Sequence, residues 1–146
     1  MNNLSKICLY FLITAVFFTS CSKEKDTAPG FMQNYSAELR GVHAVPTNSS
    51  SATALFNGTY NSSTQTLTYT LSYADMTPTS WAIHVGAAGT VGAIVFPLGP
   101  ITASPKSGSI KLNASQFSNL SAGLYYVNIV SPGFTEGEVR GQIIKL

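Results

Sequence analysis

The sequence has 146 residues, only 10% of them charged, and a formal net charge of +2. Its length fits one domain and a leader, since single domains cluster at roughly 100 to 150 residues. Lys6, Lys23 and Lys25 lie outside the expected domain, which is therefore close to neutral and offers no basic face for nucleic acid.

The first 21 residues have the pattern of a bacterial lipoprotein signal peptide. Lys6 precedes an apolar run over residues 7–18, which is shorter than the roughly 20 residues of a spanning helix, so a permanent membrane helix is the weaker alternative. Phe18-Thr19-Ser20-Cys21 resembles a lipobox, although Phe18 stands where Leu is usual. We therefore expect Cys21 to carry the lipid, palmitate included, and to anchor the chain in the cell envelope, at the outer membrane.

Cys8 would leave with the leader, so the domain would contain no thiol and no disulfide. Residues 22–34 are polar and aperiodic, and they predict a flexible tether. The charges of residues 22–26 resemble signals that send lipoproteins to the outer face of the outer membrane, with a plain solvated linker as the alternative. Asp26-Thr27-Ala28 resembles a short O-glycosylation motif, and glycosylation of Thr27 stays open.

Residues 35–146 predict an all-β domain: one antiparallel β-sandwich, Greek-key and immunoglobulin-like or superoxide-dismutase-like, with about eight strands. Alternating apolar and polar residues between turn clusters carry this prediction, most clearly in residues 67–73. The turn 61–65 joins that strand to the preceding one as a hairpin. Strands are expected at 36–41, 52–60, 67–73, 81–85, 91–97, 107–112, 124–131 and 138–145.

One short helix is expected between strands, over residues 114–120. Asn113 is a good N-cap and Gly123 suits the C-terminal exit. The sequence contains no long amphipathic segment, so it supports neither a βαβ unit nor a nucleotide-binding fold.

Four stretches carry a family resemblance. They are YSAELRG (35–41) followed by HAVP (43–46), AIHVG (82–86), GLYYVNI (123–129) and GEVRGQI (137–143). In this order they resemble the chordin-type (CHRD) domain family. The resemblance implies a compact all-β domain in an extracytoplasmic protein, with no established catalytic activity. In this family the central stretch often has a second histidine where Ala82 stands, and often another where Val130 stands.

His84, beside the Gly-rich turn 86–92, is the candidate metal ligand. Copper and zinc sites need three or four ligands, and the chain offers only His43 and His84, without an acidic cluster near either. We therefore expect a structural histidine bonded at the Gly-rich turn, and no cofactor. A metal-binding or metal-dependent enzymatic domain centred on His84 is the alternative.

No catalytic residues are predicted, because no serine lies in a GxSxG elbow and the carboxylates Glu136 and Glu138 are more simply explained as surface charge. Glu138 and Arg140 lie two apart on one strand and so share a face, where each is expected to pair with the other or with a neighbour such as Glu38 or Arg40. A recognition surface is the alternative. An aromatic platform is weighed against core packing for Trp81, Tyr125, Tyr126 and Phe134.

The predicted function is that of a non-enzymatic, lipid-anchored interaction or scaffold module. A protein or a glycan is the expected ligand.

Overall fold

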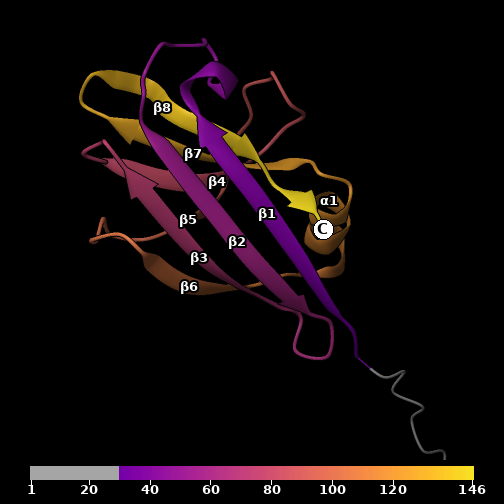
Figure 1. The fold of residues 1–146 in the computed structure, drawn as a ribbon. Coiled ribbons are helices and arrows are strands. Elements are labelled where there is room, and N and C mark those ends of the chain that lie inside the picture. Colours follow the sequence, from indigo (N-terminus) through magenta and orange to yellow (C-terminus); the bar gives the residue numbers. More distant parts are fainter. Residues whose placement is uncertain (1–29) are drawn as a thin grey trace, which may run out of the picture.

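Nine strands and one short α-helix make up residues 30–146, the part of the chain that the computed structural model describes (Figure 1). The predicted leader, Cys21 and Thr27 lie outside the described residues. The elements are β1 (Met32–Arg40), the 3-10 turn η1 (Gly41–His43), β2 (Thr53–Asn61), β3 (Thr66–Ala74), β4 (Ser80–Val85), β5 (Ile94–Pro97), β6 (Lys106–Lys111), α1 (Ala114–Ser121), β7 (Tyr125–Ser131), β8 (Phe134–Gln142) and β9 (Ile144–Lys145).

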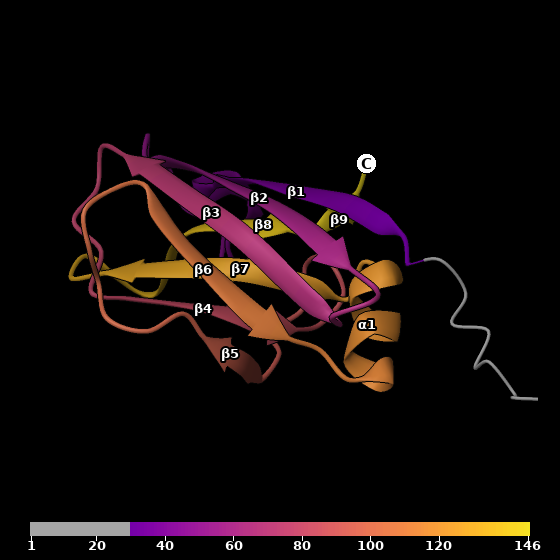
Figure 2. The same cartoon turned by 90° about the horizontal axis from the view of Figure 1, so that it is seen from below.

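All strand pairs are antiparallel, and the strands form one continuous sheet rather than the predicted two-sheet sandwich. The order is β5-β4-β7-β8-β1-β2-β3-β6, with β9 paired to β1. β1 and β8 pair only at Arg40 and Arg140, so the sheet bends sharply at this junction. The bend makes the sheet resemble a nearly closed barrel, with β5 and β6 as its end strands. Figure 2 shows β1, β2 and β3 lying over β7 and β4. The sandwich prediction is corrected in this respect, because the junction keeps both halves hydrogen-bonded as one sheet.

The core lies between these two halves. Phe56 and Leu71 enter it from one half, and Ile83, Val127 and Ile129 enter from the other, each 1% exposed or less. Burial of such side chains stabilises the fold by about 1.5 to 3 kcal/mol each. The alternating sequence of residues 67–73 predicted the first half correctly, since Leu67, Tyr69 and Leu71 are buried and their neighbours face outward.

The helix prediction is confirmed. Asn113 Oδ1 accepts a hydrogen bond from Gln116 N at 2.9 Å, and Gln116 Oε1 accepts one from Asn113 N at 2.9 Å, which is a reciprocal capping box. Gly123 follows the helix with φ +69°, a conformation that glycine adopts without strain. α1 is eight residues long, and no helix within residues 30–146 has the length and apolarity to cross a membrane.

Two predicted boundaries move. β1 begins at Met32, within the predicted tether, because Phe31 packs on Tyr60 and Phe117 with ring centroids 6.3 and 5.9 Å apart. β5 begins only at Ile94, since Gly92 lies so close to the Val85 carbonyl that a Cβ there would overlap it.

The final predicted strand is in fact two. β8 (Phe134–Gln142) begins four residues before the predicted start, and β9 (Ile144–Lys145) leaves β8 to pair with β1.

Candidate functional site

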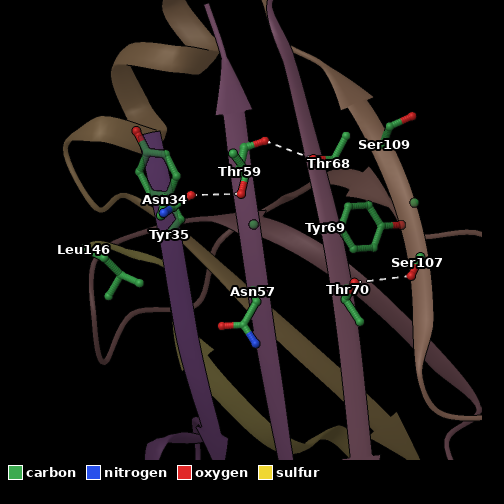
Figure 3. Close-up of a pocket in the computed structure, with 12 residues that line it drawn as sticks. Asn34, Tyr35, Asn57, Thr59, Thr68, Tyr69, Thr70, Ser107, Ser109 and Leu146 are labelled. Atoms are coloured by element: carbon green, nitrogen blue, oxygen red, sulfur yellow. Dashed lines mark hydrogen bonds between the residues drawn. The ribbon is translucent and has the colours of Figure 1, made fainter. Parts of the chain in front are cut away.

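The sheet has two outer faces, and each carries a candidate site. The first, the hydroxyl face, is the outward side of β1, β2, β3 and β6 (Figure 3). A shallow hollow of about 810 Å³ lies on it. Its outward-pointing residues are short and uncharged: Asn34, Asn57, Thr59, Thr68, Thr70, Ser107 and Ser109.

These side chains largely satisfy one another. Thr59 Oγ1 donates to Asn34 Oδ1 at 2.9 Å, and Thr68 Oγ1 donates to the Thr59 carbonyl at 3.2 Å. The hydroxyls of Thr70 and Ser107 are 3.3 Å apart. The face therefore offers a ligand few unpaired groups, and no charged side chain of residues 30–146 lines the hollow to orient one.

The second candidate, the stacked face, is the outward side of β4, β7 and β8. His84 on β4 is directly opposite Tyr126 on β7, and their rings stack with centroids 4.9 Å apart and planes 15° apart. The Arg140 guanidinium from β8 lies on the Tyr126 ring, with Cζ 3.4 Å from the centroid. A cation over a tyrosine ring in a desolvated setting is worth about 2 kcal/mol. Three neighbouring strands thus contribute one stacked layer.

The Gly-rich loop 86–92 is held over this layer by hydrogen bonds. His84 Nδ1 lies 2.9 Å from the Gly92 carbonyl, and the Tyr126 hydroxyl accepts from Gly92 N at 3.0 Å. Arg140 Nη2 donates to the Ala87 carbonyl at 3.2 Å. Because a carbonyl only accepts, the His84 proton is on Nδ1, which leaves Nε2 as an acceptor in the neutral ring. The predicted contact between His84 and the Gly-rich turn is confirmed.

Arg140 is a nearly buried cation, with only 3% of its surface exposed. Burial lowers the pKa of Arg140 below its ordinary value, while the nearby Tyr126 raises it. Within residues 30–146 no carboxylate lies within ion-pair distance of it, since Arg40 with Glu38 is the ion pair found there. Burying a charge without a counter-ion costs free energy, so the position of this guanidinium needs an explanation.

Within residues 30–146, Glu138 and Arg140 form no ion pair with each other, nor with Glu38 or Arg40. The two residues do share the outward face of β8, as predicted, but Glu138 Oε1 instead accepts from Ser50 Oγ at 2.7 Å. Asn48 Nδ2 also donates to the Glu138 carbonyl at 3.1 Å. The carboxylate therefore fastens the loop that follows η1, and Arg140 is left to the stacked layer.

Two cavities meet at Arg140. The first, the Arg140 groove, has a volume of about 680 Å³ and lies between the loop after β1 and the Gly-rich loop. Its lining includes Val42, His43, Val45, Ala88, Gln142 and Ile144. The second, the His84 pocket, has a volume of about 580 Å³, and Glu136, Ile94 and Val130 are among its walls. Both volumes are typical of cavities that hold a small molecule or a peptide end.

Two further sites considered from the sequence, an aromatic platform and a metal site, are not assembled in residues 30–146. Trp81, Tyr125 and Tyr126 are each 3% exposed or less, so these three do not form an exposed aromatic platform. Trp81 and Tyr125 belong to the core, as the core interpretation predicts, whereas Tyr126 is covered by the Gly-rich loop on the stacked face. In the described part of the chain no three histidine, cysteine, aspartate or glutamate side chains gather as a metal site. For His84, only Nε2 would remain for a ligand.

Sequence reasoning missed the partners of Arg140. The sequence predicts Tyr126 only as a core residue or as part of an aromatic platform. The run from Tyr125 to Val130 contains a single polar residue, and this signals a strand covered on both faces. From that signal one could have expected polar groups on its outward face to stack or pair beneath a loop.

The fold and site define an antiparallel β domain in which one outer face is sealed by loops around a buried arginine. The CHRD domain family model matches residues 35–143. The chain belongs to the CHRD domain family. No curated protein matches the chain, and no solved structure matches it.

Proposed function

We propose that this protein is a non-enzymatic, extracytoplasmic lipoprotein that binds a partner through the stacked face of its CHRD domain. Lipid on Cys21 holds it in the outer membrane, and the residues between Cys21 and Phe31 form the tether. The observation that carries the proposal is Arg140, a nearly buried cation that borders two cavities without a carboxylate partner in the described chain.

The direction of β1 supports this arrangement. The strand starts at Met32, next to the tether, and its nine residues extend roughly 30 Å to Arg40. Arg40 pairs with Arg140, and η1 follows at this same end (Figure 1). Arg140 therefore lies at the opposite end of β1 from Met32, where the chain enters the domain.

The stacked face also suits binding better than the hydroxyl face does. Its cavities combine aliphatic walls with a few polar groups and one charge, which is the usual composition of a ligand site. The hollow on the hydroxyl face is lined mainly by short polar side chains, several of which already pair with one another. A rigid layer beneath the cavities, made by His84 and Tyr126, keeps the guanidinium in one orientation.

Anchoring is tested by Cys21→Ser in the full chain. The variant is expected to leave the membrane fraction and to lose labelling by a fatty-acid probe, because no other cysteine follows the leader. Wild-type chain treated with the same probe is the control. Membrane retention of the variant after a carbonate wash would contradict the anchor.

Partner binding is tested by site-specific photo-crosslinking in cells. A photoreactive residue at Val91, which is exposed at the rim of the His84 pocket, is expected to capture a partner. The matched control places the same residue at Thr68 on the hydroxyl face, where no capture is expected. Capture from Thr68 alone, or from neither position, would overturn the proposed function.

A further inference from the structure

We infer that the Arg140 groove binds the C-terminal carboxylate of a peptide whose last side chain is aliphatic. This inference deepens the proposed function and rests on it. It names the chemistry that the buried cation and the walls of the groove would recognise together.

Arg140 has hydrogen-bond donors that an anionic ligand could use. Arg140 donates one hydrogen bond, from Nη2 to Ala87 O, and the rest of its donor fork has no acceptor within residues 30–146. A guanidinium presents five N–H donors in a plane and matches a carboxylate with two parallel bonds. The stack on Tyr126 fixes that plane before any ligand arrives, which lowers the ordering cost of binding.

The carboxylates nearest in the fold are already committed or lie elsewhere. Glu38 lines the groove but is paired with Arg40, and this pairing lowers the pKa of the Glu38 carboxyl. Glu138 accepts from Ser50. Glu136 lines the His84 pocket and not the groove, so an incoming carboxylate meets less repulsion in the groove.

The walls specify what the carboxylate is attached to. Val42, Val45, Ala88 and Ile144 surround the groove, and Val42 and Ile144 are 66% and 55% exposed, so an aliphatic side chain would cover them. A sugar acid would press hydroxyls against these walls without partners, which is unfavourable. Thr47 and His43 also line the groove, and their polar groups could bond the backbone N–H and C=O groups of a peptide. A fatty acid has no such amide groups.

The test measures fluorescence anisotropy of labelled Gly-Gly-Ser-Ala-Val with the full chain in non-ionic detergent. The peptide with a free carboxylate is expected to bind about tenfold or more tightly than the same peptide with a C-terminal amide. Equal affinities, or no binding of the free acid at millimolar protein, would overturn the inference. Octanoate and galacturonate compete in parallel, and displacement by either one at a lower concentration than the unlabelled peptide acid would overturn the peptide assignment.

A charge-only variant pair keeps the test independent of folding. Ala88 is exposed in the groove wall, so Ala88→Glu adds a negative charge there and Ala88→Gln adds the same bulk without it. We expect Ala88→Glu to weaken the acid peptide at least about fivefold relative to Ala88→Gln, and to leave the amide peptide unchanged. Equal effects of the two substitutions on the acid peptide would contradict the inference.

Failure of this inference and failure of the proposed function are distinguishable. Capture of a partner from Val91 together with equal binding of acid and amide peptides would keep the interaction module and remove the carboxylate chemistry. Absence of capture from Val91 would remove the proposed function, and the inference with it.

Discussion

The two outer faces of the sheet, the hydroxyl face and the stacked face, differ in how far loops cover them. On the hydroxyl face every second residue of β2 and β3 is outward and at least partly exposed, whereas in β7 all but one residue are buried. The difference comes from loops, because the segments after β1 and after β4 fold over β8 and β7 and are bonded there. The stacked face, which loops cover, can therefore keep a charged side chain away from water. The hydroxyl face is open to solvent and cannot.

The two faces also differ in whether their polar groups have partners. On the hydroxyl face most hydroxyls of the hollow pair within the face, so few polar groups there lack a partner. The covered face retains a cation whose counter-ion is missing from residues 30–146. In residues 30–146 the fully buried side-chain atom without a hydrogen-bond partner is Gln142 Oε1, which lines the same groove as Arg140. Buried polar groups are almost always paired in native proteins, so such an exception indicates a ligand, an ion or a function.

The largest effect is expected from Tyr126. Tyr126→Ala should lower the free energy of unfolding by about 3 to 5 kcal/mol, because it removes the middle of the stack and leaves a cavity. Tyr126→Phe keeps the ring but leaves Gly92 N without its acceptor, for a loss of about 1 to 3 kcal/mol. The matched hydroxyl deletion on the open face, Thr70→Val, should change it by about 0.5 kcal/mol or less. Urea denaturation measures all three, and equal losses for Tyr126→Phe and Thr70→Val would remove the contrast between the faces.

The next effect is expected from His84. His84→Ala should lower stability by about 1 to 3 kcal/mol, since the Gly92 carbonyl loses the closer of its two donors and keeps only the Tyr126 hydroxyl at 3.4 Å, while Tyr126 loses a stacking partner. Metal analysis of the purified full chain should find well under one equivalent of copper or zinc before and after the change. A stoichiometric metal that is lost in His84→Ala would favour the metal-dependent alternative.

The smallest effect is expected from Glu38, at the edge of the groove. Arg40 lowers the pKa of its carboxyl below 4.5, so the pair stabilises the folded state above that pH, and the contribution is lost as pH falls through the lowered pKa. Glu38 is a surface group, so the loss should be slight. Below pH 4.5, unfolding midpoints of wild type should approach those of Glu38→Gln, and a constant difference down to pH 2 would contradict this.

Much of the fold could be predicted because the signals are local. The alternation of residues 67–73 and the cap at Asn113 depend only on neighbouring residues, and both are confirmed. The continuity of the sheet could not be predicted in this way, because it depends on Arg40 meeting Arg140 across 100 residues.

The site was predicted less completely, for a related reason. The sequence correctly predicts that Glu138 and Arg140 share one face, but it favours a charge pair between them or with Glu38 or Arg40. The loop that brings Ser50 to Glu138 decides otherwise, and its path is set by long-range contacts such as Asn48 with Gly137. The His84 contact was predictable because its partner, Gly92, is only eight residues away.

The central claim is that Arg140 is retained for binding and adds little to stability, and Arg140→Met tests it most directly. Replacing a buried, unpaired cation with an apolar side chain of similar length is often neutral or stabilising, so the unfolding free energy should stay within about 1 kcal/mol of wild type. Affinity for the acid peptide should fall at least about tenfold, to that of the amide peptide. A variant that unfolds, or one that is folded and still prefers the acid over the amide, would contradict the account.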